Sequence, residues 1–294
     1  MTQRILLLGA TGQVGTALQR TLPELGEVAA CERSRVDLAS IDAIRSAVRE
    51  FEPDIIVNAA AYTAVDRAES EPELAMAING IAPGILAEEA RKANALLVHY
   101  STDYVFDGAK SGAYVEDDLA HPVSVYGHSK LAGEKSVQAA GGAHLIFRTS
   151  WVYGNHGANF MKTMLRLAKE RDHLRIVADQ IGAPTSSDAI AQATARCLAR
   201  YLAAADSRET LGGLYHMTCA GQTSWHGFAK AIFAEFLPES DRQRLKVEAI
   251  ATEAYPTPAR RPRNSVLSNA KLLAGFGVGL PDWRSALHEV RASA

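Results

Sequence analysis

Two residues that could together transfer a proton, Tyr126 and Lys130, are separated by three positions. In a helix, residues four apart lie on the same face, one turn from each other. A free tyrosine has a pKa of about 10, so it is a slow acid at neutral pH. Because a nearby ammonium favours the phenolate, we expect Lys130 to lower the pKa of Tyr126 toward the working range. The pair alone is a weak indication, since most such pairs are an amphipathic tyrosine beside a solvated lysine.

A glycine-rich segment near the N-terminus supplies a candidate dinucleotide site. The apolar run 4–8 predicts a buried parallel strand, and the segment Gly9–Gly15 (Gly-Ala-Thr-Gly-Gln-Val-Gly) leads from it into a predicted helix. Glycine lets the backbone approach a diphosphate closely, and a helix N-terminus offers free N–H groups. The spacing is G-x-x-G-x-x-G rather than G-x-G-x-x-G, so a simple tight turn remains the alternative.

The residues after the second predicted strand, 27–31, would lie near the adenine ribose of a dinucleotide. An acidic residue there favours the free 2′-hydroxyl of NAD, and a basic residue favours the 2′-phosphate of NADP. Glu32 and Arg33 are adjacent and favour opposite choices. The sequence therefore leaves NADPH and NADH open.

Three further predicted strands, 54–58, 96–100 and 144–149, alternate with helices. Pro72 opens a predicted long helix that reaches about Ala93, and we expect Asn79 within it to be exposed or bonded to backbone. Five strand–helix alternations predict an α/β fold with a doubly wound parallel sheet of the Rossmann type. The carboxyl ends of parallel strands share one rim. Five residues should meet there: Gly9, Ala59, Thr102, Tyr126 and Thr149.

The second half of the chain has a different pattern, which predicts a smaller α/β C-terminal substrate domain. We expect residues 1–150 to bind the dinucleotide and residues 151–294 mainly to bind substrate, with a segment at about 174–205 returning to the main sheet. This half contains predicted helices at 160–170, 187–205 and about 280–290. In the segment Tyr255–Arg263, prolines hold the chain extended while three arginines project. A guanidinium can form bidentate hydrogen bonds with a phosphate, so this segment is either a diphosphate-binding site or a solvated surface loop.

Composition excludes several classes of protein. The 294 residues are 47% hydrophobic and 22% charged, with a net charge of -2. Near-neutral charge argues against a nucleic-acid partner, and no apolar run approaches the ~20 residues of a membrane span. Three widely spaced cysteines and no apparent signal peptide predict a cytoplasmic protein with reduced thiols. The histidines form no metal-binding spacing, so no transition-metal site is expected.

Taken together, these motifs resemble the dTDP-4-dehydrorhamnose reductase family of the extended short-chain dehydrogenase/reductase superfamily, over nearly the whole chain. The glycine loop and the Tyr/Lys pair are typical of the superfamily. More specific to the reductases are Ser150–Tyr153 (Ser-Trp-Val-Tyr), Asp179–Thr185 (Asp-Gln-Ile-Gly-Ala-Pro-Thr) and Pro256–Pro262 (Pro-Thr-Pro-Ala-Arg-Arg-Pro). The resemblance implies NAD(P)H-dependent reduction of the C4 keto group of dTDP-4-dehydro-L-rhamnose to dTDP-L-rhamnose, a step of nucleotide-sugar and cell-envelope polysaccharide biosynthesis.

The alternatives are a nucleotide-sugar epimerase or dehydratase of the same superfamily, or a non-catalytic regulatory relative of the methionine adenosyltransferase subunit type. The intact Tyr126, Lys130 and Thr102 argue against lost chemistry.

The resemblance also implies residue roles. Tyr126 would donate a proton to the C4 carbonyl oxygen, Thr102 would hydrogen-bond that oxygen, and Lys130 would lower the pKa of Tyr126 and bind the nicotinamide ribose. Besides Tyr126 and Lys130, the implied cofactor-binding residues are Gly9, Thr11, Gly12, Gln13, Val14, Gly15, Arg33, Asp37, Leu38, Ala60, Ala61 and Tyr62. Besides Thr102, the implied substrate-binding residues are Val65, Asp103, Trp151, Asn159 and Arg261.

In one respect the chain departs from the family. Some members form a dimer bridged by Mg²⁺ on three glutamates, and the matching positions here are Ala17, Asp188 and Ser293. A hard cation prefers several charged oxygen ligands, and one carboxylate remains. We therefore expect no bound Mg²⁺, and a monomer or weak dimer without a bridging metal.

Overall fold

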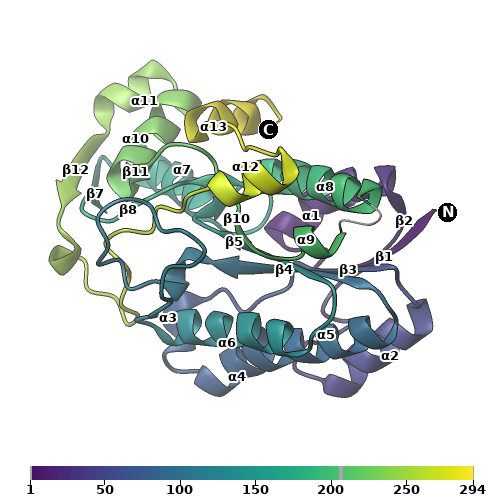
Figure 1. The fold of residues 1–294 in the computed structure, drawn as a ribbon. Helices are drawn as coiled ribbons and strands as arrows, with labels where there is room; N and C mark the ends of the chain where they lie inside the picture. Colours follow the sequence, from purple (N-terminus) through teal and green to yellow (C-terminus); the bar gives the residue numbers. More distant parts are fainter. Residues whose placement is uncertain (1, 205–207, 294) are drawn as a thin grey trace.

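A parallel sheet covered by helices on both faces forms the larger part of the protein, and a smaller lobe from the C-terminal half lies beside it (Figure 1). The computed structural model describes residues 2–204 and 208–293. The predicted end of a helix at Ala205 and the last residue of the predicted substrate domain, Ala294, lie outside the described residues.

Six parallel strands make up the main sheet, in the order β2-β1-β3-β4-β5-β10. They are β1 (Gln3–Leu8), β2 (Gly26–Cys31), β3 (Ile55–Asn58), β4 (Leu96–Thr102), β5 (His144–Thr149) and β10 (Gly213–His216). This confirms the doubly wound parallel sheet. Leu8 pairs with Asn58, and Thr102 pairs with Thr149, so neighbouring strands end level with each other. The chain leaves β1 toward β2 and returns to β3 on the other side, which opens a crevice at the carboxyl ends.

Successive side chains of each strand point to opposite faces of the sheet, so the sheet separates two hydrophobic core clusters. In β1, Ile5 and Leu7 face one hydrophobic cluster, while Leu6 and Leu8 face the other. Each of these fully buried side chains contributes roughly 1.5–3 kcal/mol of transfer free energy. One face carries α2 (Ile41–Phe51), α4 (Pro72–Met76), α5 (Ala82–Lys92) and α6 (Val125–Ala139) (Figure 1). The other carries α1 (Gln13–Thr21), α8 (Ser187–Ala203), α9 (Arg208–Leu211) and α12 (Ala270–Phe276).

The prediction of one continuous helix from Pro72 to Ala93 is wrong for one turn. Between α4 and α5 the backbone forms a π-helical segment, η2 (Ala77–Ile81). Pro83 has no N–H to donate to the Asn79 carbonyl, so the regular helical ladder is broken there. That carbonyl instead lies close to Gly133 of α6, where an added Cβ would be 2.1 Å from it. Asn79 is bonded to backbone as expected, but it is also buried.

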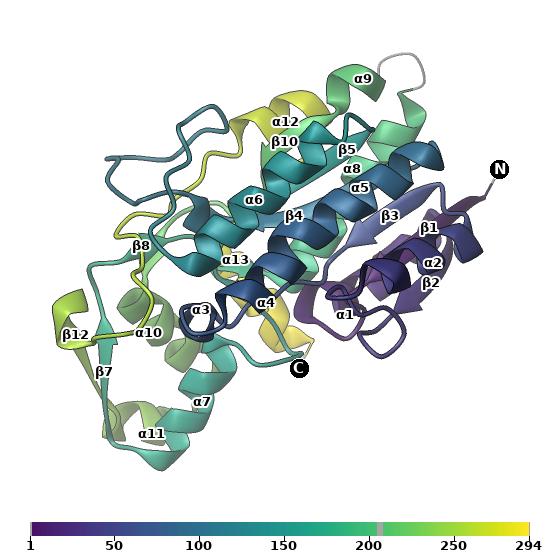
Figure 2. The same cartoon turned by 90° about the horizontal axis from the view of Figure 1, so that it is seen from below.

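A lobe built from residues of the C-terminal half extends from the sheet (Figure 2). Strand β7 (His173–Val177) pairs in parallel with β12 (Lys246–Ile250), and three helices pack nearby: α7 (Phe160–Glu170), α10 (Trp225–Phe236) and α11 (Glu239–Arg244). The last helix is α13 (Trp283–Ala292), which contacts α10. The remaining short strands pair as β6 (Val152–Tyr153) with β9 (Thr185–Ser186), and β8 (Ile181–Gly182) with β11 (Thr223–Ser224).

We expected the segment 174–205 to return to the main sheet. Its helix α8 does pack against α1, but its strand β7 pairs with β12 in the small lobe. The strand that joins the main sheet is β10, beside β5. The four residues of β10 are too short and irregular in pattern to stand out in the sequence. The described residues also include the short helical turns η1 (Leu22–Glu24), α3 (Val65–Ala68), η3 (Asp103–Val105) and η5 (Thr252–Ala254).

A buried ion pair attaches α6 to the sheet. Arg148 of β5 donates to both carboxylate oxygens of Glu134, at 2.8 and 2.6 Å, and Ser101 Oγ of β4 donates to the same carboxylate at 2.5 Å. Both charged side chains are fully buried. Removing one member of such a pair leaves an uncompensated charge inside the protein.

Glu134→Gln should therefore lower the free energy of unfolding by roughly 3–5 kcal/mol. Urea denaturation followed by circular dichroism measures the change. The matched control is Glu170→Gln, which removes an exposed i,i+4 partner of Arg166 and should cost less than about 0.5 kcal/mol. Equal, small losses in both variants would contradict the structural role of the buried pair.

Candidate active site

The glycine loop after β1 forms a close-packed turn that opens onto the start of α1. Gly9 has a positive φ of 77°, and an added Cβ would lie 2.5 Å from the backbone nitrogen of Ala60. At Gly15, an added Cβ would lie 2.0 Å from the Gly9 carbonyl oxygen. Gly12 is the N-cap of α1 and makes no side-chain capping bond. The first N–H groups of α1 are thus available to a phosphate, as predicted for a dinucleotide site.

The other predicted residues of this loop lie around that helix start. Thr11 is exposed, and Val14 packs partly against the core. The Gln13 side chain accepts a hydrogen bond from Asn159 Nδ2 at 2.9 Å. Asn159 also caps α7 by accepting from Lys162 N. Asn159, which the resemblance assigned to substrate, therefore links the glycine loop to the C-terminal lobe.

At the predicted adenine end, two polar side chains are accessible and one apolar side chain is not. Arg33 pairs with Asp37 at 3.6 Å, and both side chains face solvent. Leu38 is buried and packs into the core with Ile44 of α2. The role predicted for Leu38 at the adenine end stays a prediction, and its buried side chain favours a contact through the backbone.

The loop after β3 is held by two buried asparagines. Asn58 Oδ1 accepts from Ala60 N at 3.2 Å. Asn79 Oδ1 accepts from Tyr62 N at 2.8 Å, and its Nδ2 donates to Tyr62 O and to Ser129 Oγ. The backbone of Ala60, Ala61 and Tyr62 is thereby fixed beside the glycine loop. The π-helical turn explains how a mid-helix asparagine reaches this loop; the sequence signal for it was Pro83.

The predicted proton-transfer residues meet at the carboxyl end of β4. Thr102 Oγ1 donates to Asp103 Oδ1 at 2.9 Å, and the Thr102 hydroxyl lies near enough to the Tyr126 phenol to lower its pKa. Ser150 Oγ donates to the other oxygen of Asp103 at 3.0 Å. Ser124 caps the helix that carries Tyr126 by accepting from Gly127 N at 3.2 Å. The structure thus brings Thr102, Asp103 and Tyr126 into one polar cluster at the rim.

Burial dominates the electrostatics of this cluster. The pKa of Tyr126 is raised to about 12: loss of hydration is the largest cause, the Thr102 hydroxyl acts to lower it, and the Asp103 charge acts to raise it. Burial also raises the pKa of Asp103 to about 6, against the lowering effect of hydrogen bonds from Ser265, Thr102 and Ser150. Tyr126 therefore holds its proton at neutral pH, while Asp103 is mostly ionised.

Lys130 does not produce the pKa shift that we expected for Tyr126. Its Nζ donates to the Tyr100 carbonyl oxygen at 2.5 Å and lies 3.4 Å from His99 Nε2. Burial lowers the pKa of Lys130 to about 8, and Glu134 one turn along α6 raises it. The prediction that Lys130 lowers the pKa of Tyr126 is wrong for this arrangement, because the ammonium is directed at β4 and desolvation of the phenol prevails.

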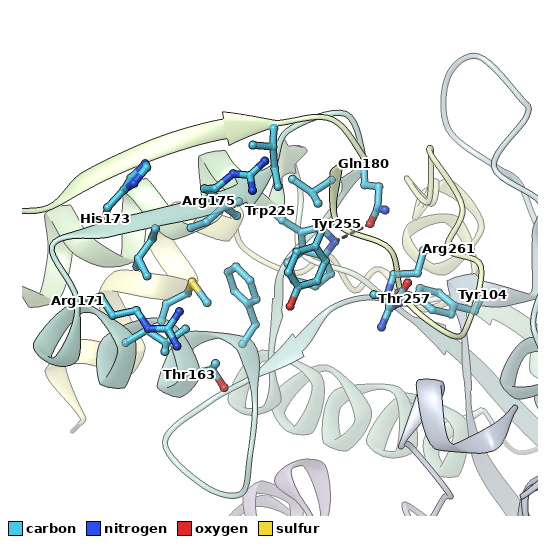
Figure 3. A pocket seen from close by; sticks show the side chains of 17 residues that line it. Tyr104, Thr163, Arg171, His173, Arg175, Gln180, Trp225, Tyr255, Thr257 and Arg261 are labelled. Carbon is cyan, nitrogen blue, oxygen red and sulfur yellow. Dashed lines mark hydrogen bonds between the residues drawn. The ribbon is translucent and has the colours of Figure 1, made fainter. Parts of the chain in front are cut away.

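A cavity of about 650 Å³ lies in the C-terminal lobe (Figure 3). Arg261, Thr257 and Tyr104 gather at one end, and Arg171 and His173 lie at the other. Apolar and aromatic side chains line the middle, including Phe160, Met164, Leu174, Ile176, Trp225 and Tyr255. Such a mixture of apolar walls and a few charged groups is typical of a site for a small organic ligand.

Arg261 joins this cavity to the rim of the sheet. It forms a bidentate ion pair with Asp66 of α3, with hydrogen bonds of 3.1 and 2.8 Å. It also donates to Thr257 Oγ1 at 2.6 Å. Its charge also favours the ionised form of the Tyr104 hydroxyl and so acts to lower that pKa, and the Tyr104 ring meets the Tyr126 ring edge-on at 5.8 Å. Of the three arginines in the segment, Arg261 alone lines the cavity.

The predicted substrate residues Trp151 and Val65 lie outside the set that lines the cavity. Trp151 has a strained φ of 47° and stacks on Trp225 with ring centroids 3.5 Å apart. Trp225 is held by a hydrogen bond from its ring N–H to Gln180. Val65 begins α3, next to Asp66. Sequence analysis missed Tyr104 and Trp225; Tyr104 directly follows Thr102-Asp103, but nothing local marks Trp225.

The three positions aligned with a family metal site border a second cavity, of about 500 Å³, lined in part by Ala17, Asp188 and Ser293. Asp188 is paired there with the guanidinium of Arg20. Within residues 2–204 and 208–293, no three His, Cys, Asp or Glu side chains group as metal ligands. Glu289 also lines this cavity, and the absence of Mg²⁺ stays a prediction. The same described part of the chain has no helix with the length and apolarity needed to cross a membrane.

Comparisons with known proteins agree with this geometry. The family described as "RmlD substrate binding domain" matches residues 3–294. A dTDP-4-dehydrorhamnose reductase of Burkholderia thailandensis is 51% identical, covering 97% of this chain and 96% of the relative. The dTDP-4-dehydrorhamnose reductase of Escherichia coli K12 is 46% identical, covering 95% of this chain and 94% of the relative.

A solved structure is similar over the full length. The crystal structure of a dTDP-4-dehydrorhamnose reductase from Bacillus anthracis, in complex with NADP, has a TM-score of 0.88 at 36% identity and covers 100% of both chains. The match includes the sheet, the glycine loop and the C-terminal lobe. The chain therefore belongs to the dTDP-4-dehydrorhamnose reductase family of the extended short-chain dehydrogenase/reductase superfamily.

Proposed function

We propose that this protein reduces the C4 keto group of dTDP-4-dehydro-L-rhamnose with NAD(P)H and so produces dTDP-L-rhamnose. The observation that carries the proposal is the cluster of Thr102 and Tyr126 at the rim, in a chain 51% and 46% identical to named reductases. These names favour a reductase over the epimerase, dehydratase and regulatory alternatives.

The residues around α1 fit a dinucleotide. The uncapped N-terminus of α1 offers N–H groups to a diphosphate, and the absence of a Cβ at Gly9 lets the loops after β1 and β3 touch. A bound reduced nicotinamide supplies a hydride to the carbonyl carbon of the substrate. In this proposal, residues 1–150 hold the cofactor and residues 151–294 mainly hold the substrate.

Proton transfer is the task of Tyr126. As C4 of the sugar accepts hydride, its oxygen gains alkoxide charge. Tyr126 gives its phenolic proton to that oxygen, and the Thr102 hydroxyl donates a hydrogen bond to it. Preplaced donors of this kind are worth roughly 3–4 kcal/mol each in the transition state. Lys130 binds the nicotinamide ribose and remains charged in part, with a pKa of about 8.

The cavity of the C-terminal lobe supplies the nucleotide-sugar site. Arg261 lines this cavity, and a diphosphate would displace Asp66 from its planar fork, which suits a pair of phosphate oxygens. Trp225 and Tyr255 provide aromatic walls for the base. Trp151, supported from behind by Trp225, lies against the sugar.

The 2′-phosphate of NADP has a candidate partner in Arg33. Its guanidinium is exposed at the end of β2, and Glu32 next to it is bonded by Ser34 Oγ at 2.7 Å. Because a 36% identical relative is solved in complex with NADP, we favour NADPH, with NADH also accepted. We further propose a cytoplasmic monomer or weak dimer, with the Arg20–Asp188 pair in place of a bridging Mg²⁺.

Tyr126→Phe should keep the fold and the affinity for cofactor but reduce kcat by 100-fold or more, on the order expected for losing a general acid. Steady-state turnover and fluorescence titration with NADPH measure the two quantities. Tyr114→Phe is the matched control, because it removes a tyrosine hydroxyl that donates to Asp107 and does not line the cavity. Turnover of Tyr126→Phe near that of the wild type would remove Tyr126 from the mechanism.

Arg261→Ala should raise the KM for the nucleotide sugar by roughly 10-fold, the scale of one charge-assisted hydrogen bond. The KM for the cofactor should stay within about twofold. Arg263→Ala is the control, because that neighbouring arginine is exposed and pairs with Glu253. If Arg261→Ala raised both KM values equally, the arginine would be structural.

Asp103 should make stability depend on pH in an unusual direction. Its folded pKa of about 6 lies above the ordinary value of 3.8, so ionising it opposes folding. Asp103→Asn should therefore be more stable than the wild type at pH 7.5, by ~3 kcal/mol, and most of this gain should vanish by pH 4.

The control for this experiment is Asp107→Asn, because the Ala109 N–H holds the pKa of Asp107 below its usual value. That variant should be less stable than the wild type at pH 7.5, with a difference that shrinks as the pH falls. Urea denaturation at each pH gives both differences. A loss of stability in Asp103→Asn at pH 7.5 would contradict the buried, charged Asp103.

A further inference from the structure

The side chains behind Lys130 form a chain of polar contacts that begins at the loop after β3. Ala60 N donates to Asn58 Oδ1, which fixes the orientation of the Asn58 amide. The amide nitrogen of Asn58 then faces His99 Nδ1 at 3.2 Å. An amide nitrogen can only donate, so His99 Nδ1 is the acceptor. In a neutral imidazole the proton is then on Nε2.

His99 Nε2 lies 3.4 Å from Lys130 Nζ. The three side chains Asn58, His99 and Lys130 are 1%, 1% and 2% exposed, so water cannot replace these contacts. Burial holds the pKa of His99 well below its usual value, and the Lys130 charge lowers it further. The ring is therefore neutral, and its N–H is directed at Nζ. The Tyr100 carbonyl is the acceptor that remains for the ammonium, at 2.5 Å.

We propose that His99, with its tautomer fixed by Asn58, is a positioning residue that directs Lys130 Nζ to the Tyr100 carbonyl. A lysine has four flexible torsions, and a buried donor on one side of Nζ limits the positions it can take. The same chain connects Nζ to the backbone of Ala60, beside the glycine loop. The inference rests on the proposed role of Lys130 in binding the nicotinamide ribose.

Two substitutions of His99 distinguish the roles of its two ring nitrogens, Nδ1 and Nε2. In His99→Asn the amide oxygen takes the place of Nδ1 and keeps the acceptor for Asn58, but nothing faces Lys130. In His99→Gln the amide nitrogen takes the place of Nε2 and keeps a donor toward Lys130. We expect His99→Asn to lower kcat on the order of 10–100-fold, the scale of a misplaced catalytic group, and His99→Gln to recover most of that loss. The KM for the sugar should stay within about twofold in both.

The control for a lost buried hydrogen bond is Thr194→Val, which removes the partner of the Tyr100 hydroxyl on the opposite face of β4. It should leave kcat within about twofold. Histidine-selective ¹⁵N NMR of the wild-type protein reads the tautomer directly, and we expect the proton of His99 on Nε2.

A proton on Nδ1, a near wild-type kcat in His99→Asn, or equal losses in the Asn and Gln variants would each overturn the inference. Lys130→Met distinguishes this failure from failure of the proposed site. If Lys130→Met keeps turnover, the role of Lys130 is wrong. If it loses turnover while His99→Asn does not, only the positioning role of His99 is wrong.

Discussion

Parallel pairing of the strands is the constraint on which the site depends, because it places the residues that follow β1, β3, β4 and β5 along one edge. Leu8 is level with Asn58, and Thr102 is level with Thr149. The glycine loop can then touch the loop after β3, and the end of β4 can meet the start of α6. The close approach of the glycine loop to the loop after β3 also requires small residues, as at Gly9, where any Cβ would collide with Ala60.

Burial at this edge determines the charge states. Desolvation raises the pKa of Tyr126 and Asp103 and lowers that of Lys130, so each group moves toward its neutral form. For a proton donor this is useful, since Tyr126 keeps its proton until alkoxide charge develops beside it. The C-terminal lobe reaches the same cluster through Arg261, which contacts Asp66 of the first half of the chain and lines the cavity together with Tyr104.

The sheet was predictable because its signals are local, and the catalytic roles of the residues at its rim stay predictions. Short apolar runs followed by small or hydroxyl-bearing residues indicated β1, β3 and β4, and the resemblance supplied roles for Thr102 and Tyr126. The fold differs from the prediction where contacts between segments far apart in the sequence determine the local structure. Strand β10 is only four residues long, the π-helical turn at Asn79 depends on Pro83 and close packing against Gly133, and Trp225 meets Trp151 only through the folding of the lobe. The direction of Lys130 follows from His99 and the Tyr100 carbonyl, which no spacing in the sequence encodes.

The most direct test of the account is the absorbance of the reduced nicotinamide while dTDP-4-dehydro-L-rhamnose is added, with NADPH and NADH in parallel. A reductase consumes cofactor and sugar one for one, so the account predicts a stoichiometric loss of absorbance, faster with NADPH. Bound cofactor with no loss of absorbance would contradict it, since an epimerase regenerates its cofactor and a regulatory relative binds it without turnover.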